Sequence, residues 1–252
     1  LAPTAERPLL AAQRLDRVLA LWRTRALERQ PVAAVSADPA AAAFPGSVPA
    51  DAASETTTVR LDLAVHGRRS TGCYAAPGAR ITVRSDRAPP PGARLRIGAH
   101  SDDITRRDRW PRLPRITRTF PFAGETVEGA CAFGGPVYVE LPPGQSGELT
   151  VTIDGAVAAP LFELGRTDLG AWRERLRHAP APWAELVTSK VILTVPSAAI
   201  RSLDDPVALL EFWDRVLDGA ATLAGRPVAR ARPERYVPDV EIQNGYMHSG
   251  YP

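Results

Sequence analysis

Residues 56–65 read Thr-Thr-Thr-Val-Arg-Leu-Asp-Leu-Ala-Val and alternate between apolar and polar side chains. Apolar residues occupy every second position from Val59 to Val65, and the charged side chains of Arg60 and Asp62 stand between them. Successive side chains of a β-strand point to opposite faces of its sheet. The stretch therefore predicts a strand with one face in a core and the other in solvent.

Shorter runs with the same alternation follow this stretch. They are Ile81–Val83, Leu95–Ile97, Val137–Leu141 and Leu149–Ile153, and Pro/Gly turns at 89–92 and 142–144 lie between them. Short alternating strands divided by turns are typical of β-sandwiches. Residues 56–165 are therefore predicted to form a β-sandwich-like domain.

The N-terminal residues 1–30 are predicted to contain an amphipathic helix at 8–29. Its apolar side chains recur at steps of three and four residues, which places them on one helix face. They are Leu15, Val18, Leu19, Trp22 and Ala26. We expect this face to pack on a neighbour. Residues 31–55 turn to Ala, Pro, Ser and Asp without an apolar period, which predicts a linker that buries too little surface to become ordered.

After the predicted sandwich, helical and strand patterns mix. A short helix is expected at 168–177, a strand at 191–195 and an edge strand at 236–243. A longer helix should open at Asp204-Asp205-Pro206, because an Asp can cap the first free amides, and should end at Gly225. The fold class is therefore α+β, with residues 166–252 forming the start of a mixed α/β domain.

Charge and length exclude several classes of protein. The chain has 31 basic and 28 acidic residues, a balance that does not suit a nucleic-acid-binding surface. No stretch reaches the roughly 20 apolar residues of a membrane-spanning helix. Both ends read as cuts, and no signal peptide is visible. Cys73 and Cys131 leave two alternatives open: one disulfide of an exported protein, or two buried thiols.

The residues alone reveal no catalytic motif. A zinc peptidase of the common type needs His-Glu-x-x-His, which puts two imidazoles on one helix face beside a carboxylate. The four histidines, His66, His100, His178 and His248, include no pair at this spacing. No Gly-x-Ser-x-Gly elbow is present for a serine nucleophile.

Three other features have competing interpretations. His100 with Asp102 and Asp103 suggests a metal cluster, but the pattern favours a turn whose side chains bond their own backbone. Residues 134–135, Gly-Gly, allow close approach by a ligand or by another strand. Trp183 suits stacking on a sugar ring, but its Ala-Pro-Trp-Ala setting favours a packed anchor.

Several segments, in this order, resemble the enhancin-like zinc metallopeptidases. They are Ile-Gly-Ala-His-Ser-Asp-Asp at 97–103, Ala-Phe-Gly-Gly-Pro-Val-Tyr at 132–138, Ala-Pro-Trp-Ala-Glu-Leu at 181–186 and Gly-Tyr-Met-His-Ser-Gly-Tyr-Pro at 245–252. Residues 192–197 and 232–239 fit the same pattern, so the resemblance covers about residues 60–252. In this family the His-Glu-x-x-His helix follows shortly after the Gly-Tyr-Pro segment.

The resemblance implies a parent enzyme that is a secreted or surface zinc peptidase of bacteria and cuts mucin-like, O-glycosylated proteins. Because the chain ends before the zinc ligands, we expect it to bind no zinc and to hydrolyse nothing by itself. Tyr246, His248 and Tyr251, which directly precede the expected zinc helix, are predicted to bind substrate, together with Gly134 and Gly135. For His248, an exposed side chain at the end of a strand is the alternative interpretation. The alternative is a non-catalytic glycan- or protein-binding module.

Overall fold

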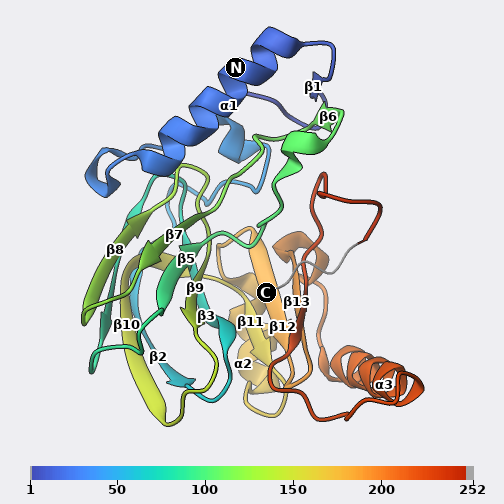
Figure 1. The fold of residues 1–252 in the computed structure, drawn as a ribbon. Helices are drawn as coiled ribbons and strands as arrows, with labels where there is room; N and C mark the ends of the chain where they lie inside the picture. The colour runs from blue at the N-terminus through green and yellow to red at the C-terminus, as the bar shows by residue number, and fades with distance from the viewer. Residues whose placement is uncertain (1, 248–252) are drawn as a thin grey trace.

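Most of the regular structure is β-sheet, with few helices (Figure 1). The structure is a computed structural model that describes residues 2–247. The larger body contains β2 (Glu55–Asp62), β3 (Gly67–Ala75), β4 (Arg80–Ser85), β5 (Arg94–Ile97), β7 (Arg118–Pro121), β8 (Thr126–Ala130), β9 (Gly135–Leu141) and β10 (Glu148–Ala158). Their order is β7-β5-β9-β3-β10-β4-β8, and β2 also pairs with β10. The predicted α+β class is confirmed.

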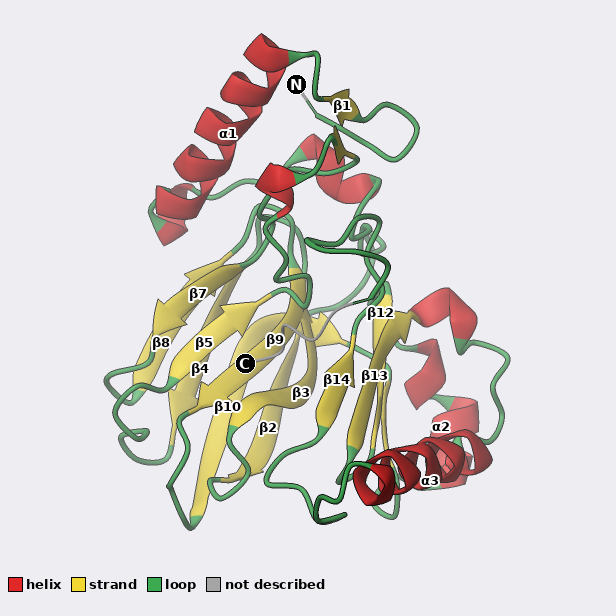
Figure 2. Cartoon of the chain, turned by 45° about the vertical axis from the view of Figure 1, so that its right-hand side comes forward, coloured by secondary structure: helices red, strands yellow, loops and turns green. Residues whose placement is uncertain are grey.

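Strand β10 joins the two parts of this eight-stranded sheet, β2, β4 and β8 on one side and β3, β5, β7 and β9 on the other. Its residues 148–154 pair with β2 and β4, Ala156 pairs with β2, and residues 157–158 pair with β3. Gly155 lies between the residues that pair with β4 and those that pair with β3 and has φ +83°, a backbone conformation that residues with a Cβ rarely adopt. The terminal strands β7 and β8 lie side by side, so the sheet is nearly closed (Figures 1 and 2).

The alternating pattern of the sequence correctly identifies the core of the sandwich. Leu61 and Leu63 of the first predicted strand are buried, while Arg60 and Asp62 between them are exposed. The inward side chains of the other strands join them in one cluster, which includes Ile81, Val83, Leu95, Ile97, Val137, Val139, Leu149, Val151 and Ile153.

A second, smaller sheet stands beside the sandwich and carries helices on one face (Figures 1 and 2). It has the order β11 (Leu161–Glu163), β12 (Trp183–Val187), β13 (Val191–Pro196) and β14 (Glu234–Tyr236). The helices are α2 (Leu169–Glu174) and α3 (Val207–Leu223). Phe162, Trp172, Leu186, Leu193, Leu210 and Leu217 form the core between helices and sheet.

Helix α3 matches its prediction closely. The Asp205 carboxylate accepts a hydrogen bond from Val207 N at 2.9 Å, and Gly225 follows the helix with φ +63°. The predicted strand at 236–243 is shorter and earlier: β14 covers Glu234–Tyr236 and pairs only with β13, at the sheet edge. The edge position is as predicted. Pro238, which cannot donate to a ladder, lies just beyond the strand's end.

Helix α1 (Arg14–Arg29) begins later than predicted, after the short strand β1 (Leu9–Leu10), which pairs with β6 (Arg109–Trp110). The prediction of its buried face was wrong. The predicted stripe faces solvent, with 73% of Trp22 exposed, whereas Ala20 and Thr24 are buried. Small side chains let the helix approach its neighbours closely, and this contact outweighs the larger stripe.

Residues 31–55 are ordered against the sandwich, so the prediction of a linker without buried surface was wrong. They contain the short helices η1 (Val32–Ala34) and η2 (Pro39–Ala42). Ala40 and Ala41 are buried in the sandwich core. The buried carboxylate of Asp38 forms an ion pair with Arg23 at 2.6 Å and accepts a hydrogen bond from Ala40 N. Small side chains and one satisfied charge thus provide an order that periodicity does not reveal.

Cys73 and Cys131 are both free and buried, so the disulfide is absent and the buried-thiol alternative holds. Their sulfurs donate to different backbone carbonyls, those of Thr71 and Ile116. Burial raises the pKa of the Cys131 thiol to about 11. The remaining short helices are η3 (Ile104–Arg106), η4 (Leu176–His178) and η5 (Ser197–Ala199). No helix within residues 2–247 is long and apolar enough to cross a bilayer.

Candidate functional site

A pocket of about 670 Å³ lies where the sandwich meets the second sheet. The segment after β5 forms one wall, and β14 with the residues after it forms the other. Its lining comprises Arg68, Ala99, His100, Ser101, Asp102, Trp213, Arg235, Tyr236, Val237, Pro238, Asp239, Ile242, Tyr246 and Met247. We call it the junction pocket.

The aromatic side of the junction pocket consists of Trp213 from α3 and Tyr236 from β14. Their ring centroids are 5.3 Å apart and their planes are tilted by 36°. Tyr236 is 37% exposed, so part of its ring is open to a ligand. Ser101 and Asp102 on the sandwich wall supply a hydroxyl and a carboxylate. Exposed rings beside a few polar groups are a usual composition for small-ligand pockets.

His100 supports this wall from behind. It is only 3% exposed, and its ring packs edge-on against Phe44 and Trp183, with centroids 4.5 Å away in each case. Its Nε2 has no hydrogen-bond partner within the described part of the chain. Burial lowers the pKa of His100 to about 4, against an opposing effect of Asp239. The imidazole is therefore neutral at physiological pH.

The predicted turn is formed by Asp103 rather than by His100. The Asp103 carboxylate accepts hydrogen bonds from Thr105 N, at 2.9 Å, and from the Thr105 hydroxyl. His100 instead points into the interior, where Phe44 covers its ring. Phe44 comes from the segment predicted to be a linker. Trp183 is the packed anchor that its sequence setting favours: it is buried, and its Nε1 donates to the Pro45 carbonyl at 2.7 Å.

Asp239 fixes the segment after β14 onto the sandwich. Its two carboxylate oxygens accept hydrogen bonds from Arg112 Nε and Nη2, at 2.9 and 2.6 Å. Both side chains are buried, and a bidentate pair of this kind defines orientation as well as distance. Asp102 accepts a further hydrogen bond from Gln243 N at 2.7 Å. These contacts hold one wall of the junction pocket in register with the other.

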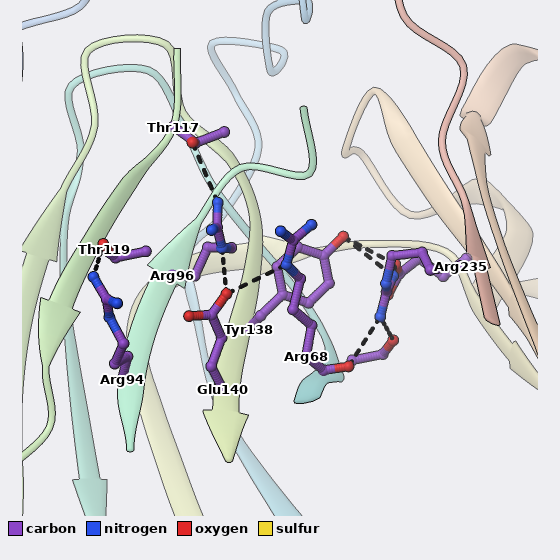
Figure 3. Close-up of polar contacts among 10 residues, drawn as sticks. Arg68, Arg94, Arg96, Thr117, Thr119, Tyr138, Glu140 and Arg235 are labelled. Carbon is purple, nitrogen blue, oxygen red and sulfur yellow. Dashed lines mark hydrogen bonds and ion pairs between the residues drawn. The ribbon is translucent and has the colours of Figure 1, made fainter. Parts of the chain in front are cut away.

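Arg68 and Arg235 of the junction pocket lining belong to a buried ionic network (Figure 3). Arg235 of β14 forms an ion pair with Glu185 of β12 and donates to the Arg68 carbonyl of β3 at 3.1 Å. Its guanidinium lies 4.6 Å from the centre of the Tyr138 ring. The Tyr138 hydroxyl in turn donates to Glu185 at 2.9 Å. Arg235 therefore joins the second sheet to the sandwich.

A second carboxylate serves two arginines in the same region. Glu140 forms ion pairs with Arg68 and Arg96, as Figure 3 shows. Burial and the positive charge of Arg96 lower the pKa of Arg68 to about 10. The network therefore contains three guanidinium groups, of Arg68, Arg96 and Arg235, and two carboxylates.

Of the residues predicted to bind substrate, only Tyr246 is seen at the junction pocket, where its side chain is 98% exposed. His248 and Tyr251 lie outside the described residues. Gly134 and Gly135 are not among the residues that line the junction pocket. A Cβ on Gly135 would lie 2.5 Å from Gly98 Cα, so backbone occupies the space, which is the strand alternative.

Most of the lining lies in segments that the family resemblance singled out, namely residues 97–103, 232–239 and 245–252, but nothing in the sequence predicted that these segments meet in a pocket. Sequence reasoning missed Arg68, Trp213 and Ile242, which belong to none of them.

The donor set of residues 2–247 does not fit a zinc ion. No group of three or more His, Cys, Asp or Glu side chains in this part of the chain is arranged so that it could hold a metal ion. The nitrogen of His100 without a partner is enclosed by aromatic rings rather than by further donors.

Comparison with known protein families covers residues 50–252. Residues 50–154 match the N-terminal domain of M60-like peptidases, and residues 155–252 match peptidase M60, enhancin and enhancin-like. The border between the two matches falls inside β10, between Asp154 and Gly155.

Human TRPM8 channel-associated factor 2 is 42% identical over 185 residues, which are 73% of this chain and 20% of that protein. The Xenopus laevis TRPM8 channel-associated factor homolog is 41% identical over 186 residues, covering 73% of this chain and 21% of its own length. The chain thus spans about a fifth of the length of these curated relatives.

Solved structures share the fold at low identity. The IMPa metallopeptidase of Pseudomonas aeruginosa, in complex with T-antigen, has a TM-score of 0.55 at 19% identity and covers 82% of this chain and 28% of its own. IMPa has also been solved with an O-glycopeptide. The ZmpB metallopeptidase from Clostridium perfringens has a TM-score of 0.53 at 13% identity, covering 71% and 44%. The chain belongs to the M60 family of enhancin and enhancin-like peptidases, of which it contains the N-terminal domain and an N-terminal portion of the peptidase domain.

Proposed function

We propose that this chain is part of a secreted zinc metallopeptidase that hydrolyses peptide bonds in mucin-like, O-glycosylated proteins, and that the junction pocket binds the glycan. The exposed ring of Tyr236 opposite Ser101 and Asp102 carries this proposal. The apolar face of a sugar ring packs on an aromatic side chain, while its hydroxyls bond to carboxylates and hydroxyls at its edge. The zinc ligands would come from outside residues 2–247.

The family and its solved members support a glycosylated substrate. IMPa, which shares the fold, binds T-antigen and an O-glycopeptide. Tyr246, His248 and Tyr251 remain proposed as residues of the substrate cleft in the complete enzyme. The curated relatives are vertebrate proteins, so the bacterial origin suggested by the sequence stays a prediction.

The test is binding of the T-antigen disaccharide to the isolated chain, followed by isothermal titration calorimetry. Tyr236→Ala should weaken binding about tenfold, since a lost aromatic contact of about 1.4 kcal/mol corresponds to that factor. Trp22→Ala is the matched control, because Trp22 is an exposed aromatic residue on α1 that does not line the pocket. Equal binding by the Tyr236 variant would contradict the assignment of this pocket.

A second candidate function is a non-catalytic glycan- or protein-binding module. The curated relatives favour it, since they are named for association with a channel and not for hydrolysis. The full-length parent separates the two candidates. If it cleaves an O-glycopeptide and a chelator abolishes cleavage, the peptidase is supported. If it binds the glycopeptide and never cleaves it, the module is the better description.

A further inference from the structure

One face of helix α1 is apolar and is not covered by the rest of the described chain. We call its exposed side chains the α1 stripe: Leu15 (72% exposed), Val18 (60%), Leu19 (49%) and Trp22 (73%). They recur at steps of three and four residues, so they are neighbours along one side of the helix. Large exposed apolar patches mark sites that bind another protein or a membrane.

Helix α1 is held on the molecule through its opposite face. Ala20 is fully buried there, and Arg17 donates to the Arg107 carbonyl at 2.6 Å. Near the end of the helix, Glu28 forms an ion pair with Arg115. A fixed helix at one end of the molecule therefore presents the α1 stripe outward (Figures 1 and 2).

Positive charge accompanies the α1 stripe. Arg14, Arg25 and Arg29 are exposed on the same helix. Arg14 precedes Val18 by four residues and Arg25 follows Trp22 by three, so both lie beside the stripe, whereas Arg29 continues it one turn further on. Among residues 2–247, no hydrogen bond or ion pair holds the guanidinium groups of these three arginines.

No exposed carboxylate of α1 offsets this charge. Glu28 is held by Arg115, and Asp16 is half-buried and accepts a hydrogen bond from Gln13 Nε2 at 3.2 Å. The charge therefore argues against a second copy of the chain as the partner, because pairing two α1 stripes would bring the arginines of both copies together. An anionic surface that also offers hydrocarbon suits both the stripe and its arginines.

We propose that α1 binds the surface of an anionic lipid membrane, with the α1 stripe among the upper acyl chains and Arg14, Arg25 and Arg29 at the headgroup phosphates. Helices that lie in the membrane interface combine large apolar side chains such as Trp and Leu with basic residues. Trp favours this interface, because its ring is apolar and its indole N–H still finds an acceptor.

The shape of the site favours a membrane over an acidic protein. The exposed side of α1 is a convex ridge, which a bilayer accepts without a matching groove, whereas a protein partner would have to supply one. The contact anchors the chain to a surface and does not require it to cross the bilayer. It is independent of the proposed hydrolysis and glycan binding.

The experiment measures co-sedimentation of the whole chain with vesicles of phosphatidylglycerol and phosphatidylcholine in equal parts. We expect saturable binding that weakens as sodium chloride increases and is much weaker with phosphatidylcholine alone. Trp22→Ser should weaken it about tenfold or more, because a large apolar side chain no longer leaves water. Arg25→Gln should weaken it about fivefold, as expected for one basic residue at an anionic surface.

Two variants elsewhere on the molecule are matched controls that should bind like the wild type. Phe212→Ser removes an apolar side chain that is 52% exposed on α3, and Arg60→Gln removes a charge whose side chain is 72% exposed on β2. Fluorescence reports insertion directly. The emission of Trp22, taken as the difference between the wild type and Trp22→Phe, should shift to shorter wavelength with the anionic vesicles, because the indole leaves water.

Each result decides the inference. Binding that falls in Trp22→Ser and Arg25→Gln and is kept in both controls supports it. Equal loss in a control, or an unshifted Trp22 emission, overturns it. Absence of saturable vesicle binding also overturns it and leaves a protein as the occupant of the α1 stripe. Sedimentation equilibrium without lipid examines that occupant: a dimer that Trp22→Ser dissociates would mean that a second copy covers the stripe in place of a membrane.

Discussion

At the scale of single residues, His100 shows how burial determines chemistry. Its ring is enclosed by Phe44 and Trp183, and the charged groups facing it are Asp239, Arg112 and Asp102. Burial dominates, so the pKa of His100 falls to about 4. An ordinary histidine has a pKa of about 6.5. The unfolded chain therefore takes up a proton at this residue well before the folded chain does.

This difference predicts a pH dependence of stability. Because the pKa of His100 is lowered in the folded chain, this residue does not change the folding stability above about pH 6.5. Stability is lost as the pH falls from there towards about 4. A shift of this size corresponds to a loss of about 3 kcal/mol in the free energy of unfolding. Urea unfolding of the wild type and of His100→Phe at several pH values measures it.

The phenylalanine variant cannot take up the proton, while every other titrating group is the same in both proteins. Its unfolding free energy should therefore fall less between pH 6.5 and 4 than that of the wild type. If the free energy of unfolding falls equally in both proteins between pH 6.5 and 4, His100 takes up its proton in the folded chain as readily as in the unfolded chain.

At the scale of elements, α1 has its apolar stripe in solvent and its small residues in the interface. Ala20 is fully buried, and Arg17 lies over the Trp110 ring at 3.9 Å and donates to the Arg107 carbonyl at 2.6 Å. The helix is therefore held by close backbone approach and by arginine contacts with β6 and the residues before it.

Substitutions on the two faces of α1 should differ in effect. Trp22→Ser should change the free energy of unfolding by less than about 0.5 kcal/mol, as for an ordinary surface position. Ala20→Leu should cost about 1–3 kcal/mol, because the larger side chain has no room. The midpoints of urea unfolding measure both changes, provided that the dependence of the unfolding free energy on urea concentration stays the same. A cost well above 1 kcal/mol for Trp22→Ser would mean that the stripe is covered in solution, which sedimentation at several concentrations would then examine.

At the scale of the whole molecule, one arginine connects the two bodies. Arg235 on β14 reaches the Arg68 carbonyl and the Ser70 hydroxyl of β3 and forms an ion pair with Glu185. The side chains of Arg235 and Glu185 are almost completely buried. A buried ion pair adds little stability relative to an apolar replacement, but removing one partner leaves an uncompensated charge.

Arg235→Met should therefore cost about 3–5 kcal/mol in the free energy of unfolding, since Glu185 loses its counter-charge. The double variant Arg235→Met with Glu185→Leu should recover most of that loss. Arg84→Met is the surface control, because the ion pair of Arg84 with Asp154 is solvent-exposed and its loss should cost much less stability. Unfolding in denaturant measures the free energy of unfolding of these three variants. A small cost for Arg235→Met alone would mean that water reaches Glu185 and that the two bodies are joined by other contacts.

The sequence by itself determined helix α3 and five strands of the sandwich, namely β2, β4, β5, β9 and β10. It did not reveal β3, β7 and β8. Alternation around Leu61 and the capping signals at Asp205 and Gly225 are local, and local patterns act within a few residues. The ordered family segments also identified the fold and the family, which the comparisons confirm.

Only the tertiary structure decided which face of α1 is buried, that residues 31–55 are ordered, and where the junction pocket lies. Periodicity shows that a helix has an apolar face, but not which face meets a neighbour. The junction pocket brings His100 together with Trp213 and Tyr236. These neighbours are far apart along the chain, and their contacts depend on how whole sheets pack, a property that no short stretch of sequence contains.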